Sequence, residues 1–101
     1  MPRRRVEFAA EALEEAEAAI RWYRERSPTA ANALEGEIEA TVQSILESPA
    51  AWVEGPRRTR RALLSRFPFA VVYREREDAI EVVAFAHGRR RPGYWRSRVK
   101  K

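Results

Sequence analysis

The chain has 101 residues, which is enough for one domain and too short for two independent hydrophobic cores. It has no cysteine and one histidine, which excludes a disulfide framework and cysteine catalysis and argues against a histidine-ligated metal centre. The formal net charge is +5, and no apolar stretch approaches the roughly 20 residues that cross a bilayer. We therefore expect a single cytoplasmic domain (1–101) with no membrane contact, no metal and no cofactor.

The first 50 residues predict a short strand followed by a pair of helices. Residues 3–8 alternate between polar and apolar side chains, which is typical of a strand with one buried face. Residues 9–26 are rich in alanine and glutamate and predict a helix. Ser27 and Pro28 suit the N-cap and first position of a second helix that runs to about Glu47. So short a break predicts an antiparallel helical hairpin.

Each predicted helix has one apolar stripe for a sheet to cover. The stripes are Ala9, Leu13, Ala16, Ile20 and Tyr23 in the first helix, and Ala31, Leu34, Ile38, Val42 and Ile45 in the second. Trp22 falls on the opposite, glutamate-rich face of the first helix. Two interpretations stay open for Trp22, which is either capped by a loop or offered to a partner protein.

Three strands are predicted after a loop over residues 49–58. They cover residues 59–64, 69–76 and 79–86, and the last two are rich in β-branched and aromatic side chains. The polar pair Glu77-Asp78 between them is typical of a tight hairpin turn. The predicted order is β-α-α-β-β-β, an α+β fold in which a helical hairpin packs on an antiparallel sheet.

Charge is distributed unevenly along the chain. Residues 1–50 contain six arginines and ten acids, a net charge of −4, whereas residues 51–101 contain fourteen cations and five acids, a net charge of +9. Of the 20 cations, 18 are arginine, and the two lysines are residues 100 and 101. The field of the second half suits a phosphate backbone or an acidic protein partner. A solvated basic surface is the alternative.

Several side chains of the second half could form a site where neighbouring strands end. Arg60 and Arg61 are consecutive in a strand, so one faces the helices and the other faces the open side of the sheet. The remaining candidates in this region are Arg66, His87, Arg89, Arg90, Arg91, Tyr94, Trp95 and Arg98.

This constellation allows metal-independent cleavage of RNA, in which the 2′-hydroxyl attacks its own phosphate. Guanidinium groups bind phosphate and stabilise developing charge, an imidazole transfers protons, and aromatic rings stack on bases. His87 would be the acid or base, and Tyr94 and Trp95 would be the stacking rings. The alternative interpretation is structural: a histidine at a strand end, two rings packed on the sheet and a solvated arginine run.

Two stretches of the sequence resemble the RelE/ParE superfamily of toxins from type II toxin–antitoxin, or plasmid-stabilisation, modules. They are residues 60–74 (RRALLSRFPFAVVYR) and residues 82–95 (VVAFAHGRRRPGYW). The helical half is similar too, so the resemblance covers nearly the whole chain. It implies the RelE/ParE-like fold, growth arrest as the function, and neutralisation by a cognate antitoxin in a hetero-oligomer.

The resemblance leaves two targets open. RelE-like members cut mRNA in the ribosomal A site without metal, whereas ParE-like members bind and poison DNA gyrase. Ribosome-dependent members commonly use lysines, and this chain has none before position 100, which favours gyrase inhibition slightly. A family member that has lost its toxicity and only pairs with its antitoxin is a third interpretation.

The candidate residues divide according to these alternatives. An endoribonuclease would use His87, Tyr94, Arg61 and Arg90 as catalytic residues. The residues that would bind the target or a nucleic acid are Arg60, Arg66, Arg89, Arg91, Trp95 and Arg98. Trp22 is the candidate for the contact with the antitoxin.

Overall fold

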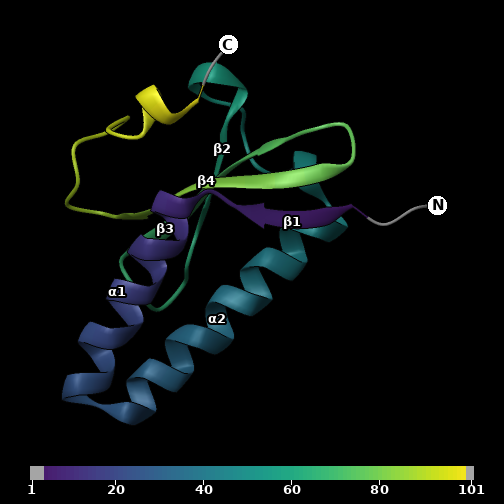
Figure 1. The fold of residues 1–101 in the computed structure, drawn as a ribbon. Helices are drawn as coiled ribbons and strands as arrows, with labels where there is room; N and C mark the ends of the chain where they lie inside the picture. Colours follow the sequence, from purple (N-terminus) through teal and green to yellow (C-terminus); the bar gives the residue numbers. More distant parts are fainter. Residues whose placement is uncertain (1–3, 100–101) are drawn as a thin grey trace.

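The computed structural model describes residues 4–99, which form six main elements, with two short 3-10 turns between α2 and β2 and a third after β4. The elements are β1 (Arg5–Phe8), α1 (Ala10–Arg26), α2 (Pro28–Glu47), β2 (Arg60–Leu63), β3 (Phe69–Glu75) and β4 (Ala79–His87). These bounds lie within one or two residues of those predicted, although Arg3, where the first strand was expected to begin, lies outside the described residues. The α+β fold with a helical hairpin on a sheet is confirmed (Figure 1).

The sheet has four strands in the order β1-β4-β3-β2. β3 pairs antiparallel with both β2 and β4, as predicted, but β1 pairs parallel with β4, with Val6 opposite Ile80. Parallel neighbours need a crossover connection between them, and the helical hairpin is part of the long connection from β1 to β4. The sheet is therefore mostly antiparallel, with one parallel pair at its edge.

The helical hairpin packs on one face of the sheet, below it in Figure 1. Ser27 joins the helices, and its hydroxyl accepts a hydrogen bond from the N–H of Ala30 at 3.2 Å, which caps α2 as expected from the sequence. In α1 the buried side chains are Ala12, Ala16 and Ala19, and Leu13 is 46% exposed. The predicted inclusion of Leu13 in the buried stripe is wrong, because the small alanine side chains form the face of α1 that approaches the sheet.

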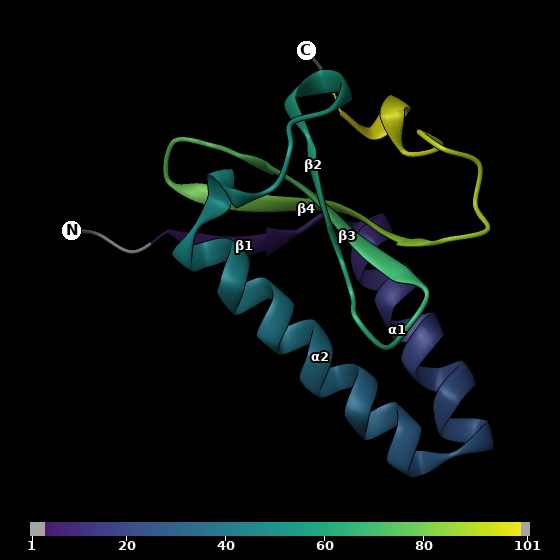
Figure 2. The ribbon, with the colours of Figure 1, turned by 180° about the vertical axis from the view of Figure 1, so that it is seen from behind.

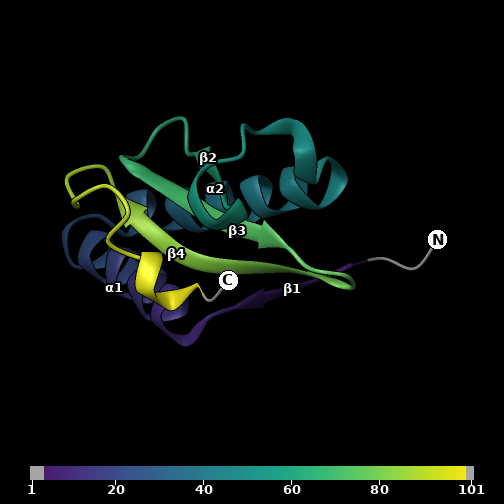
Figure 3. The ribbon, with the colours of Figure 1, turned by 90° about the horizontal axis from the view of Figure 1, so that it is seen from above.

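The face of the sheet away from the helices is covered in part by the C-terminal segment, residues 88–99. Trp95 and Val99 are buried there against Val72 of β3 and against Val83 and Ala84 of β4. Val72 pairs with Ala84 and Tyr73 pairs with Val82, so Val83 is an extra residue in β4, a β-bulge. Figure 3 shows the segment lying over β4 on the side opposite the helices.

The C-terminal segment also contacts the loop that precedes β2. The Nη1 atom of Arg57 donates a hydrogen bond to the carbonyl oxygen of Val99 at 3.1 Å, and the two segments lie side by side in Figure 2. Arg57 and its neighbour Arg58 both have positive φ angles, of 57° and 61°. Two consecutive non-glycine residues in this region of the Ramachandran map are strained, and the surrounding contacts must hold them there.

Candidate functional site

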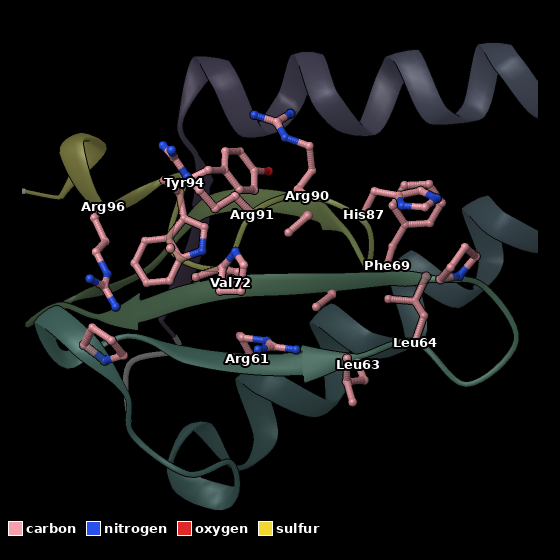
Figure 4. A pocket seen from close by; sticks show the side chains of 18 of the residues that line it. Arg61, Leu63, Leu64, Phe69, Val72, His87, Arg90, Arg91, Tyr94 and Arg96 are labelled. Atoms are coloured by element: carbon pink, nitrogen blue, oxygen red, sulfur yellow. The ribbon is translucent and has the colours of Figure 1, made fainter.

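A groove lies on the open face of the sheet, between β2 and β3 on one side and residues 88–96 on the other (Figure 4). We call it the arginine groove. Its volume is about 460 Å³. Its apolar floor and rim are formed by Leu63, Leu64, Phe67, Pro68, Phe69, Ala70, Val72 and Ala86, and its polar and aromatic lining by Arg61, His87, Arg90, Arg91, Tyr94, Trp95 and Arg96.

Four guanidinium groups line the arginine groove, and none of its described lining residues is acidic. Arg61 projects from β2 onto the open face beside Leu63, while Ala62 is buried toward the helices, so strand alternation decides which of the two consecutive arginines faces the groove. No ion pair within residues 4–99 is recorded for Arg61, Arg91 or Arg96, and all three are exposed. The groove is therefore a concentration of uncompensated positive charge.

Glu15 of α1 fixes the C-terminal segment beside the groove. Its carboxylate accepts hydrogen bonds from both Nη atoms of Arg98, at 3.0 and 2.9 Å, from the Tyr94 hydroxyl at 2.8 Å and from the N–H of Phe85 at 3.0 Å. Burial alone would raise the pKa of Glu15, but the hydrogen bonds from Arg98, Phe85 and Tyr94 outweigh it and hold the pKa below its usual range. Glu15 is therefore the charged centre of the cluster that holds this segment.

Tyr94 is held in the protonated state by this cluster. Burial and the hydrogen bond to Glu15 raise the pKa of Tyr94 to about 12. The Arg90 guanidinium lies over the Tyr94 ring at 3.7 Å from its centroid, and the Arg98 guanidinium lies 5.1 Å from it. Arg90 thus covers one face of the ring, and the phenol proton is donated in a hydrogen bond to Glu15.

His87 lines the other end of the groove, at the end of β4. Its Nδ1 atom accepts a hydrogen bond from the N–H of Arg89 at 2.9 Å, and its ring packs edge-on against Phe69 with 5.1 Å between centroids. Figure 4 places Arg90 between His87 and Tyr94. The N–H of Arg90 donates to the His87 carbonyl oxygen at 3.0 Å, but within the described residues no hydrogen bond joins the imidazole to Tyr94 or to a guanidinium of the groove. The sequence-predicted acid–base residues share one groove without forming a hydrogen-bonded pair.

The remaining predicted residues lie outside the groove lining, with one exception. The Arg60 side chain donates a hydrogen bond to the carbonyl oxygen of Trp52, and the Arg66 Nε atom lies 3.8 Å from a Glu37 carboxylate oxygen. Arg89 is exposed in the turn after β4, and Arg98 is part of the Glu15 cluster. Trp95 does line the groove, but it is only 4% exposed, so its ring faces are packed and offer no platform for stacking on a base.

Trp22 is 51% exposed near the end of α1. No loop within residues 4–99 caps it: its ring contacts Tyr23 edge-on at 4.9 Å between centroids and the Arg26 guanidinium at 3.8 Å. Leu13, on the same helix, is also exposed. Trp22 and Leu13 are two of the four exposed large hydrophobic side chains in the described part of the chain.

Sequence reasoning missed Glu15 and Arg96. Glu15 is not among the predicted site residues, although it lies three residues after Ala12 and four before Ala19, which are both buried. That spacing places it at the edge of the buried face and was the available signal. Arg96 had no signal, because its place depends on the turn at Gly93, where φ is +76° and an added Cβ would lie 2.6 Å from the Arg96 Nε atom.

The comparisons with known proteins agree with this architecture. Residues 6–92 match the family described as the ParE toxin of the type II toxin–antitoxin system parDE. The chain is therefore a toxin of a type II toxin–antitoxin system. Within that class it belongs to the ParE family, and the expected partnership with an antitoxin follows from this membership.

A solved structure described as the chromosomal ParDE TA system from P. aeruginosa is similar in fold. Its TM-score is 0.70 at 17% sequence identity, and the alignment covers 83% of this chain and 95% of the other. No curated protein sequence matches the chain significantly. Among residues 4–99, no helix is both long enough and apolar enough to span a membrane.

Proposed function

We propose that this toxin, when it is free of its antitoxin, arrests growth by binding and inhibiting DNA gyrase rather than by cleaving RNA. The superfamily resemblance leaves gyrase and the ribosome as the two targets, and membership of the ParE family supports the first. The toxin would then act in the cytoplasm, where gyrase acts on the chromosome.

The state of Tyr94 is the observation that carries this proposal. A metal-independent ribonuclease must remove a proton from the 2′-hydroxyl and donate one to the leaving oxygen. A phenol whose pKa is about 12 and whose proton is held by Glu15 is far from the pKa that suits either step near neutral pH. Arginine stays charged and does not replace it. His87 would have to perform both transfers alone, on the far side of Arg90 from Tyr94.

Two assays on the same protein separate the two mechanisms. Purified toxin is titrated into gyrase with relaxed plasmid and ATP, and in parallel into a translating extract whose message is followed by primer extension. We expect loss of negative supercoiling and intact message, and addition of the antitoxin should restore supercoiling. Message cut at A-site codons with normal supercoiling would contradict the proposal and favour the ribonuclease.

Variants of the two acid–base candidates sharpen the comparison. Tyr94→Phe and His87→Ala should both retain growth arrest when they are induced in a bacterial host without antitoxin, provided that circular dichroism shows them folded. Loss of arrest in folded protein for both variants would point instead to proton transfer. No growth arrest by the unmodified toxin would support a family member that has lost its toxicity.

A second part of the proposal concerns the antitoxin. The exposed Trp22 side chain gives the end of α1 an apolar surface outside the lining of the arginine groove, on the side of the helix opposite the exposed Leu13. Exposed apolar side chains of this size are typical of protein interfaces, and tryptophan is a common anchor in them. We infer that the antitoxin covers this surface of α1 in the toxin–antitoxin hetero-oligomer.

A further inference from the structure

We propose that the arginine groove binds the phosphate backbone of duplex DNA, through guanidinium contacts that are independent of base sequence. The inference goes beyond gyrase inhibition, because it predicts that the free toxin binds DNA without any enzyme present. It rests on the charge of the groove, which four guanidinium groups line with no acidic residue in the described lining, and on the packing of its aromatic rings.

The positive charge of the groove favours the binding of an anionic ligand. Arg61, Arg91 and Arg96 come from two separate segments of the chain, line one concavity and have no recorded acidic partner within residues 4–99. Like charges brought together in this way repel one another, and an anion bound between them relieves the repulsion. The planar fork of each guanidinium matches the two free oxygens of a phosphodiester.

The concentration of charge in the groove favours a nucleic acid over an acidic protein. Protein interfaces are anchored by exposed aromatic or aliphatic side chains, and their centres are poor in charge. In the groove, four guanidinium groups surround an apolar floor in which Val72, Leu64 and Trp95 are buried, Phe67 and Phe69 are half-buried and Leu63 is exposed. Interfaces with DNA have the opposite character, being polar and strongly positive.

The aromatic rings of the groove distinguish duplex from single-stranded nucleic acid. Proteins bind single strands by stacking unpaired bases on exposed aromatic rings. Trp95 is buried, and the Tyr94 ring is covered by Arg90 at 3.7 Å. Of the other phenyl rings in the lining, Phe69 stacks on Phe85 and Phe67 packs edge-on against Tyr23. The rings are thus engaged within the protein, and the arginines are left to contact a backbone whose bases remain paired.

The strained loop at the edge of the groove adds a second observation. Pro56 lines the groove, and the two residues after it, Arg57 and Arg58, both adopt positive φ angles. Strained backbone conformations of this kind cluster at binding sites, where the surrounding contacts maintain them. Arg57 is held by the Val99 carbonyl, and Arg58 beside it is exposed.

The test measures binding of the full-length toxin to fluorescently labelled 20-base-pair duplexes of two unrelated sequences over a range of salt concentrations. The double variant Arg61→Ala/Arg91→Ala is compared with Arg21→Ala/Arg24→Ala, which removes the same charge from α1. We expect log K to fall linearly with log salt, and the groove variant to reduce that slope by about 1.8 on both sequences. The α1 variant should change the slope by less than half as much.

Four outcomes would overturn the inference. They are the absence of duplex binding at 50 mM salt, equal effects of the two double variants, a clear preference for the single strand of the same sequence, and groove-dependent binding of poly-glutamate in place of DNA. The last outcome would assign the groove to an acidic protein. Circular dichroism and thermal melting show whether each variant is folded.

The same variants separate this inference from the proposed function. If the toxin inhibits supercoiling but does not bind duplex DNA through the groove, the groove inference fails and gyrase inhibition stands. If the toxin binds duplex DNA through the groove but does not inhibit gyrase, gyrase inhibition fails and the groove inference stands.

Discussion

The carboxylate of Glu15 and the guanidinium of Arg98 form a two-pronged ion pair between helix α1 and the C-terminal segment, with N···O distances of 3.0 and 2.9 Å. The side chains are 19% and 17% exposed, so solvent screens the pair only partly. Arg98 also donates to the Val83 carbonyl at the β-bulge, 3.1 Å away. One helix, the central strand and the C-terminal segment therefore depend on the same carboxylate.

Replacing Glu15 should destabilise the protein. Glu15→Ala removes the acceptor of Arg98, Tyr94 and the Phe85 N–H together, and we expect the free energy of unfolding to fall by about 2 kcal/mol. Urea denaturation measures this change. Glu14→Ala, at the exposed neighbouring position, is the control and should cost less than about 0.5 kcal/mol. Equal losses in the two variants would show that the cluster contributes no stability of its own.

Acid should release part of the same stabilisation. The pKa of Glu15 lies below its ordinary value of 4.5 in the folded protein, so in acid the unfolded chain binds the proton more readily. The contribution of Glu15 is fully present above pH 4.5 and is lost as the pH falls through the lowered folded-state value. Unfolding free energies measured from pH 7 to pH 2 should therefore converge for the unmodified protein and Glu15→Gln. A difference that stays constant over this range would contradict the assignment.

Tyr94 should ionise later than an ordinary tyrosine. Its folded-state pKa is about 12 against an unfolded value near 10, so its stabilisation is complete below pH 10 and is lost as the pH rises toward 12. Absorbance titration at 295 nm follows the tyrosinate directly. The difference between the unmodified protein and Tyr94→Phe should show one group titrating near pH 12 while the protein is folded. A difference curve centred near pH 10 would mean that the hydroxyl is not held by Glu15.

The two tryptophans Trp95 and Trp22 should respond to substitution in opposite ways. Trp95 is packed against Val72, Val83 and Val99, so Trp95→Ala should cost about 3–5 kcal/mol of folding stability. Trp22→Ala, at an exposed position, should change stability by less than about 1 kcal/mol. Thermal melting of both variants checks the contrast. Similar melting temperatures for the two would place Trp95 outside the core.

Trp22 should instead contribute to the affinity of the toxin for its antitoxin. If the antitoxin covers α1, Trp22→Ala weakens the complex by at least about tenfold, because a tryptophan anchor is commonly worth 2 kcal/mol or more. Isothermal titration with the purified antitoxin measures the affinity. Val53→Ala is the control, since Val53 is 89% exposed and precedes β2, far along the chain from α1. Weaker antitoxin binding by Val53→Ala, with unchanged binding by Trp22→Ala, would show that the antitoxin contacts the loop before β2 instead of α1.

Local patterns were enough to predict the elements of the fold. Strand alternation, the Ser27-Pro28 cap and the polar turn at Glu77-Asp78 are local signals, and each gave an element boundary within one or two residues of that observed. The parallel pairing of β1 could not be predicted from local patterns, because its partner β4 begins at Ala79, 74 residues after β1 begins. Nothing in the sequence of either strand specifies that pairing.

The site was less predictable because it depends on long-range contacts. The groove arginines follow from alternation and from the arginine run, so Arg61, Arg90 and Arg91 could be named from the sequence. The burial of Trp95 and the hydrogen bond of Tyr94 could not be predicted, because Trp95 packs on β3 and β4 and Tyr94 donates to Glu15, 79 residues before it in the chain. A terminal segment without periodicity gives no signal of the surface on which it folds.

The pairing of β1 with β4 also governs when the protein can fold during synthesis. β1 leaves the ribosome early, and its hydrogen-bonding partner is among the last elements to be translated. The apolar faces of α1 and α2 stay uncovered during that interval, since their sheet does not yet exist. The nascent chain is therefore vulnerable to aggregation and proteolysis until β4 emerges.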